Sequence, residues 1–203
     1  MNKMIKNTII LTAITLVSGI LLGLVYEVTK DPIKAAQDDA KKAAFQAVIP
    51  DAASFELLPD FSPENAREIL GEAGYTESDI EEVANALDAS GASMGYVINV
   101  VSHKGYGGDI RISVGILSDG TVTGIEMLAI NETPGLGMNA AEDSFKNQFQ
   151  NKQVTEFVVT KTKESGDNMI DAISGATITS NAVTNAVNSA LVYFHVELGG
   201  SVQ

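Results

Sequence analysis

The sequence predicts an α+β fold in which helices flank an antiparallel sheet, preceded by one N-terminal transmembrane helix. Three observations support this prediction: an uncharged run near the N-terminus, three consecutive segments of alternating polarity, and an apolar stripe along the last segment. The expected parts are an N-terminal tail and transmembrane anchor over residues 1–26, a helical stalk over residues 27–50, and the α+β domain over residues 51–203.

The uncharged run extends from Asn7 to Tyr26. At about 1.5 Å per residue, a helix of this length spans roughly 30 Å, the thickness of the hydrocarbon core of a bilayer. A secretory signal peptide has a shorter apolar region and a small-x-small cleavage site, which does not follow Tyr26. We therefore expect an uncleaved single-pass anchor in the cell membrane. A short tail before one long domain is typical of an anchor whose N-terminus is inside, so the soluble domain is expected on the extracytoplasmic side.

The composition excludes several kinds of chemistry. The 203 residues include no cysteine, which rules out disulfides, thiolate nucleophiles and iron–sulfur clusters held by cysteine. Only two histidines are present, so no metal site is expected. All 26 acidic side chains follow residue 26, and the net charge is −13. Such a surface repels a phosphate backbone, so nucleic acid is not an expected partner.

Helical signals precede the predicted sheet. Apolar spacing predicts a helix over residues 32–48 that continues from the membrane and is ended by Pro50. Ser62-Pro63-Glu64 predicts a helix start with serine as the N-cap. The capping box Ser78-Asp79-Ile80-Glu81 predicts a further helix, which Ser90-Gly91 closes.

The apolar period changes to two after residue 93, which predicts strands over Met94–Ser102, Asp109–Leu117 and Thr121–Ala129. The turn Ser118-Asp119-Gly120 joins the last two, and neighbouring strands joined by tight turns pair antiparallel. The link Gly105-Tyr106-Gly107-Gly108 precedes a strand instead of a helix. We therefore interpret it as a flexible hairpin connection and not as a phosphate-binding loop.

Three further elements complete the prediction. Asn139 is the expected N-cap of a helix that ends near Phe149, and a strand is expected over Val154–Lys161. The last helix is predicted from about Ser180, its expected N-cap, to Leu198, and its apolar stripe packs on the core.

The first candidate binding segment is Glu132-Thr133-Pro134-Gly135-Leu136-Gly137. Its Thr-Pro-Gly-Leu portion fits a type II turn, with proline second and a glycine of positive φ third. Gly137 permits a second close approach of the backbone. The turn presents Leu136 at its tip, where the leucine either lies on a flat ring or folds back under its own loop. The residues leave both interpretations open.

The second candidate segment lies at the entry to the last helix, where small and hydroxyl residues gather between Asp171 and Ser180. A helix N-terminus has unpaired N–H groups and a partial positive charge, and it binds phosphate well. Gly175 and Ala176 leave space for a ligand to approach. An ordinary helix cap explains the same hydroxyl residues, so this alternative stays open.

Asp171 followed by Ser174-Gly175-Ala176-Thr177 resembles the flavinylation motif D-x-x-[ST]-G-A-[ST]. In proteins with this motif, a flavin transferase joins the phosphate of FMN to the last hydroxyl residue, whose position Thr177 occupies. With the Glu132–Gly137 loop, the single anchor and the domain length, the motif makes the chain resemble the G subunit of Rnf electron-transport complexes. The C subunit of the sodium-pumping NADH:quinone oxidoreductase is related. The resemblance covers nearly the whole chain.

This resemblance implies that residues 51–203 carry FMN through a phosphoester at Thr177 and relay electrons within a membrane complex. That complex couples ferredoxin and NAD to the transport of sodium ions or protons. The implied partners are other membrane subunits and, during maturation, the flavin transferase. No catalytic acid, base or nucleophile is implied. Besides Thr177, the implied cofactor-binding residues are Ser174, Gly175, Ala176, Glu132, Thr133, Gly135, Leu136 and Gly137.

Two other functions remain open at this point. One is a stand-alone membrane-anchored flavoprotein that acts as an extracytoplasmic electron shuttle or a redox-sensing domain. The other is an anchored binding domain without redox chemistry, in which the hydroxyl residues only cap a helix.

Overall fold

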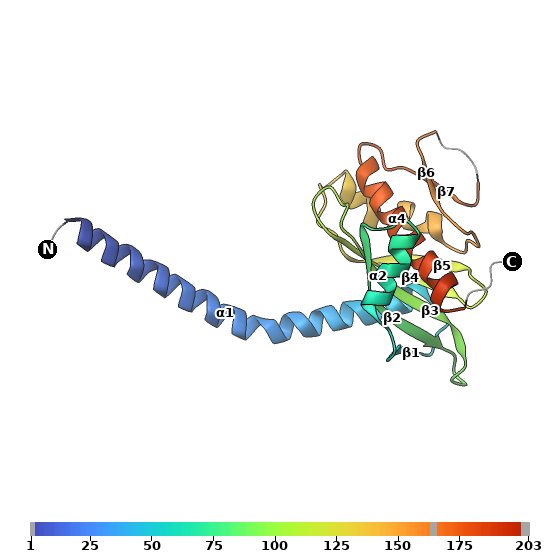
Figure 1. The fold of residues 1–203 in the computed structure, drawn as a ribbon, viewed down its shortest axis with the longest axis horizontal. Coiled ribbons are helices and arrows are strands. Elements are labelled where there is room, and N and C mark those ends of the chain that lie inside the picture. The colour runs from blue at the N-terminus through green and yellow to red at the C-terminus, as the bar shows by residue number, and fades with distance from the viewer. Residues whose placement is uncertain (1–2, 163–165, 200–203) are drawn as a thin grey trace. The chain divides into compact units, whose positions relative to one another are not determined.

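The computed structural model describes residues 3–162 and 166–199 (Figure 1). Its contacts divide the chain into two units, residues 1–41 and 42–203. The first unit consists of most of helix α1 (Lys3–Val48), which contains Pro32 in its interior. Within the described residues, α1 is the one helix long and apolar enough to cross a membrane, and no residue of its most apolar window is buried. The predicted anchor and stalk segments are therefore parts of one continuous helix.

The second unit is built on a five-stranded sheet in the order β1-β2-β3-β4-β5, and every neighbouring pair is antiparallel. The predicted antiparallel sheet is thus confirmed. A separate parallel pair joins two short strands near the C-terminal end of the domain. The five strands of the sheet are β1 (Ser54–Leu57), β2 (Ser78–Leu87), β3 (Ser93–Ser102), β4 (Ile110–Leu117) and β5 (Val122–Ala129), and the parallel pair is β6 (Val158–Thr160) with β7 (Met169–Asp171).

Helices α2 (Pro63–Glu72) and α4 (Thr177–Glu197) cover one face of the sheet (Figure 1). The side chains that meet there are mostly branched and aromatic, and together they form the main core of the domain. Ser62 caps α2 as predicted, since its Oγ accepts the Asn65 N–H at 3.3 Å. Buried residues of this core include Ile98, Val100, Ile112, Val114, Val183, Val187, Leu191 and Phe194.

The other face of the sheet receives the C-terminal end of α1. Phe45, Val48 and Ile49 are buried there against small residues of β2 and against Val97. Thr123 on β5 donates a hydrogen bond to the Val48 carbonyl. The last turns of α1 therefore belong to the folded domain and are held by both packing and a backbone contact.

The segment beginning at Ser78 is strand β2, and the prediction of a capped helix there was wrong. It pairs with β3 over its whole length, and the register shifts between Ile80 and Glu82. This bulge interrupts the alternation of buried and exposed residues, which hides the strand period in the sequence. Pairing along two neighbouring strands outweighs the local capping signal.

The other differences concern short elements. The helix expected after Asn139 is divided into a 3₁₀ turn η1 (Gly137–Ala141), α3 (Asp143–Lys146) and a second 3₁₀ turn η2 (Asn147–Phe149). Asn139 lies inside η1 and donates to the Gly135 carbonyl instead of capping a helix. The strand expected over Val154–Lys161 is reduced to β6, and its partner β7 was not predicted. Both strands of this pair are too short to show a period.

Ion pairs connect β2 to its neighbours. Arg67 on α2 lies 3.0 Å from Asp79, and its guanidinium lowers the pKa of that carboxyl. His103 follows β3 and bridges Asp79 and Asp109, at 3.2 and 2.9 Å. Hydrogen bonds to Asp109 and then to Asp79 raise the pKa of His103 above its ordinary value. Asp79 and Glu81, which belonged to the predicted capping box, thus pair with basic side chains. Glu81 lies 3.0 Å from Arg111.

Gly115→Ala is expected to destabilise the domain. A Cβ at this position would lie 2.8 Å from the Val48 carbonyl oxygen and 3.0 Å from Cγ1 of Ile49, and closer still to Thr123 Oγ1. Overpacking of this kind lowers the free energy of unfolding by about 1–3 kcal/mol. Gly124→Ala is the matched control, because Gly124 pairs with Gly115 and a Cβ there would have open space within 4 Å among the described residues. Urea unfolding of the full chain in detergent measures both, and equal losses would contradict this account.

The bridge at His103 predicts a pH-dependent contribution to stability. Because its pKa is raised in the folded state, the stabilisation is fully present below about pH 6.5, and it is lost as the pH rises through the raised value. The side chain is 41% exposed, so the effect is at most about 1 kcal/mol. The difference in unfolding free energy between the wild type and His103→Gln should shrink over that range. A difference that stays constant with pH would refute the prediction.

Candidate functional site

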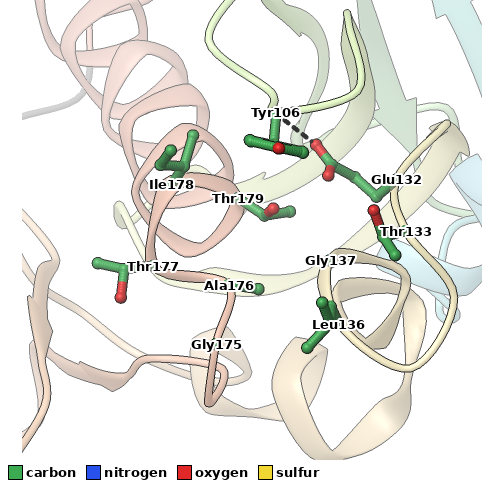
Figure 2. A pocket seen from close by; sticks show the side chains of 10 residues that line it. All are labelled: Tyr106, Glu132, Thr133, Leu136, Gly137, Gly175, Ala176, Thr177, Ile178 and Thr179. Carbon is green, nitrogen blue, oxygen red and sulfur yellow. Dashed lines mark hydrogen bonds between the residues drawn. The ribbon is translucent and has the colours of Figure 1, made fainter.

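Three segments far apart in the sequence enclose a cavity of about 500 Å³ (Figure 2). The link between β3 and β4 contributes Tyr106, the segment after β5 contributes four residues, and the start of α4 with the loop before it contributes the rest. The lining residues are Tyr106, Glu132, Thr133, Leu136, Gly137, Gly175, Ala176, Thr177, Ile178 and Thr179.

The first wall is the predicted type II turn after β5. The Leu136 N–H donates to the Thr133 carbonyl at 3.1 Å, and Gly135 has a φ of 76°. Positive φ at the third position defines this turn and suits glycine. Leu136 is 42% exposed at the tip, so it does not fold under its own loop.

A second turn of the same kind lies at residues 173–176. The Ala176 N–H donates to the Ile173 carbonyl at 2.9 Å, and Gly175 in the third position again has a φ of 76°. A Cβ on Gly175 would lie 3.0 Å from Cδ2 of Leu136. The tips of the two turns therefore meet, and the absence of a side chain at residue 175 permits their approach.

Side chains from elsewhere in the domain fix the loop that leads into α4. Gln148 accepts from the Asp171 N–H at 2.7 Å and donates to the Asp171 carbonyl at 3.3 Å, as a neighbouring strand would. Ser180 Oγ accepts from the Ile173 N–H at 2.9 Å and donates to the Ala176 carbonyl at 3.0 Å. Each end of the loop thus has its own hydrogen-bonded support.

Helix α4 begins at Thr177, three residues before the predicted start, so Ser180 is not its N-cap. The N-cap is Ala176, and no side chain caps the helix among the described residues. The Ser180 N–H makes the first helical bond, to the Ala176 carbonyl at 3.0 Å. The N–H groups of the preceding helical residues therefore lie at the cavity end, where they and the helix dipole favour an anion.

Glu132 lies under the rim of the cavity and is only 7% exposed. Its Oε1 accepts the N–H of Tyr106 at 2.7 Å and that of Gly107 at 3.2 Å, as Figure 2 shows for Tyr106. A Cβ on Gly137 would lie 2.6 Å from the other carboxylate oxygen and 2.7 Å from Thr179 Oγ1. The carboxylate is thus closely surrounded by both the link and the turn.

Most of the residues selected from the sequence come together here. Of the nine, all but Ser174 and Gly135 line the cavity, and those two occupy positions within the two turns. Sequence reasoning missed Tyr106, Ile178 and Thr179. The glycines around Tyr106 were a usable signal, since a Cβ on Gly107 would collide with the Asn131 carbonyl and one on Gly105 with that of Gly108. The link is therefore closely packed, and it joins the antiparallel strands β3 and β4 as a hairpin connection, as expected.

Comparisons with known proteins agree with this architecture. A family model described as "FMN-binding domain" matches residues 105–192, and one described as "RnfG N-terminal region" matches residues 1–48. In the crystal structure of Shewanella oneidensis NqrC, 62% of the chain superposes on 61% of this one, with a TM-score of 0.50 and 26% identity. The fold is thus that of a known group of FMN-binding domains.

Relatives match over nearly the full length. The chain is 35% identical over 190 residues to the G subunit of the Na(+)-translocating ferredoxin:NAD(+) oxidoreductase complex of Acetobacterium woodii, covering 92% of this chain and 89% of the relative. It is 32% identical over 199 residues to the G subunit of the proton-translocating ferredoxin:NAD(+) oxidoreductase complex of Clostridium ljungdahlii, covering 98% and 96%. With such identity along almost its whole length, the chain belongs to the RnfG family, the G subunits of ion-translocating oxidoreductase complexes.

Proposed function

We propose that this chain is the electron-relay subunit of a membrane complex that couples electron transfer between ferredoxin and NAD to ion transport. The proposal follows from the family and from the cavity, which joins the two motif segments at the start of α4. The flavin is FMN, and we propose that it is held covalently by a phosphoester at Thr177. The ion is sodium or a proton, since relatives named for each are similar to this chain.

The residues around the cavity fit FMN. A volume of about 500 Å³ lies within the usual range of sites for small cofactors. Leu136, Tyr106 and Ile178 supply apolar surface for a flat ring, while α4 has no side-chain cap among the described residues and leaves N–H groups for a phosphate. A Cβ on Gly137 would collide with Glu132 and Thr179, so a glycine is needed for the turn to approach these two lining residues. The cavity therefore has an apolar part and an anion-binding end.

Four hydroxyl groups lie near that end, and their surroundings favour Thr177 as the acceptor. Ser180 is buried and makes two hydrogen bonds, so its oxygen is already engaged. Thr179 is 1% exposed, and Ser174 lies on the exposed turn outside the lining. Thr177 is half-buried, lines the cavity and begins the helix. A flavin transferase, which we propose as a maturation partner, would find this hydroxyl at the cavity edge.

FMN supplies one- and two-electron transfer when it is bound, and the chain supplies its position and surroundings. The first turn of α4 would receive the phosphate, because its free N–H groups and dipole stabilise negative charge. Leu136, held by the type II turn, would limit water on one side of the ring. The other membrane subunits of the complex would deliver and remove electrons.

We propose further that residues 1–26 anchor the chain, that residues 27–50 form a stalk whose last turns pack on the sheet, and that the domain over residues 51–203 lies on the extracytoplasmic side. The long apolar helix after a short tail supports this arrangement. A covalent link has a clear use there, because a cofactor released outside the cytoplasm is lost by dilution.

Thr177→Ala is expected to abolish covalent flavin, and Thr177→Ser to retain part of it, because only the serine keeps a hydroxyl at the start of α4. The measurement is in-gel flavin fluorescence after denaturation, followed by peptide mass mapping of protein from a host with the transferase. Thr184→Ala is the matched control, because Thr184 lies on the same helix but outside both the motif and the cavity lining, and this variant should keep the flavin. Fluorescence that survives in Thr177→Ala, or a modified peptide at another residue, would overturn the attachment site.

A reporter fused after Gln203 tests the orientation. At this position, a reporter that is active only outside the cytoplasm should give signal, and one that is active only in the cytoplasm should not. The reason is that the anchor places the residues that follow it on the outer side. The same two reporters fused ahead of Lys3 serve as the reciprocal control. Signal from the cytoplasmic reporter at the C-terminus would place the flavin inside the cell.

A further inference from the structure

The buried carboxylate of Glu132 accepts hydrogen bonds from the protein backbone, and flavin binding does not explain these bonds. Burial of an ionised group is costly unless hydrogen bonds compensate for the lost water. Here Oε1 accepts two consecutive backbone N–H groups, those of Tyr106 and Gly107, from a segment 26 and 25 residues earlier in the chain. Hydrogen bonds to a charged acceptor are stronger than those between neutral groups. Glu132 therefore fixes the link between β3 and β4.

The link is shaped to receive this carboxylate. A Cβ on Gly105 would lie 3.0 Å from Oε1 of Glu132, and one on Gly107 would collide with the Asn131 carbonyl. The base of the link is closed by the 2.9 Å contact between His103 and Asp109. Residues 105–108 thus have little freedom, although they form an exposed connection.

The hydrogen bonds from the link to Glu132 fix the position of Tyr106. Its side chain is 74% exposed although its ring is large and apolar. Figure 2 shows Tyr106 and Leu136 on opposite sides of the cavity, with Thr179 and Ala176 between them. An aromatic ring in this position can stack on, or meet edge-on, a flat conjugated ligand held against Leu136. A bound ligand would cover the ring of Tyr106, which explains why so large a side chain is exposed.

We propose that Glu132 is a positioning residue that holds Tyr106 as the aromatic wall of the flavin site, an inference that rests on the function proposed above. The carboxylate acts through the backbone of the link, and Tyr106 makes the contact with the flavin ring. This assigns Glu132 a different role from that of a direct flavin ligand, which the sequence motif implied.

The first experiment measures amide hydrogen exchange in the full chain purified without flavin from a host that lacks the transferase. Glu132→Ala should speed exchange of the Tyr106 and Gly107 amides at least about tenfold, as expected for the loss of a hydrogen bond. Glu132→Gln keeps an acceptor oxygen but loses the charge, so its exchange should speed up much less than that of Glu132→Ala. Unchanged exchange in Glu132→Ala would overturn the proposal, whether or not the protein ever carries flavin.

Asp88 provides a matched control in another loop. Its Oδ1 accepts the N–H groups of Ser90 and Ala92 at 2.7 and 2.9 Å, in the turn at the opposite end of β3 from Tyr106. Asp88→Ala should speed exchange of those two amides and leave that of Tyr106 unchanged. Faster exchange at Tyr106 in this variant would mean general loosening and would also overturn the proposal.

The second experiment uses the loaded protein and measures flavin fluorescence, which a stacked tyrosine quenches. Tyr106→Leu and Glu132→Ala should each raise the fluorescence by a similar factor, and the double variant should rise no further, because both remove the same contact. Glu132→Gln should restore most of the quenching. Additive increases would show that Glu132 acts independently of Tyr106 and would refute its positioning role.

Two safeguards keep the outcomes separate. If Glu132→Ala does not fold, Glu132→Asp replaces it, since the shorter side chain withdraws the carboxylate by one methylene group. If the wild type carries no flavin after expression with the transferase, the proposed function fails. The exchange measurement then still decides whether Glu132 fixes the link.

Discussion

The approach of Leu136 to Gly175 is the contact on which the cavity depends. Each belongs to a turn whose glycine has a φ of 76°, and Cδ2 of Leu136 lies 3.0 Å from where a Cβ on residue 175 would be. Because the turns meet, the uncapped start of α4 faces the apolar surface of the first turn. A bulkier residue at either tip would separate the uncapped start of α4 from the apolar surface of the first turn.

Local chemistry made much of the fold predictable. The hairpin of β4 and β5 has an Asp-Gly turn, and α2 has a serine cap with proline at its first position, so neighbouring residues determine both. Strand β2 was not predictable in this way. Its bulge after Ile80 disrupts the period, and Ser78 with Glu81 imitates a capping box. Pairing with β1 and β3, together with the ion pairs of Asp79 and Glu81, gives the segment its conformation.

The same distinction applies to the candidate site. The turn at Gly135 was predictable from the sequence, because a type II turn requires particular residues at fixed positions, whereas the second turn, at Gly175, was not predicted. The glycines around Tyr106 signalled a closely packed link, but the place of Tyr106 over the cavity depends on a hydrogen bond from its own backbone to a carboxylate in a distant segment. The prediction of Ser180 as the N-cap of α4 was wrong, because its hydroxyl accepts a hydrogen bond from the loop before the helix. Such roles arise from tertiary contacts that no local pattern encodes.

The order of the elements along the chain has a consequence for biosynthesis. Helix α4 is the last described element, and its buried residues continue to Phe194, near the end of the chain. While those residues are still in the ribosome, the sheet lacks the helix that covers much of one face, and the turn at Gly175 has no support from Ser180. A nascent or truncated chain therefore offers no finished cavity. Under the attachment that we propose for Thr177, a transferase meets the finished cavity only after α4 has packed on the sheet.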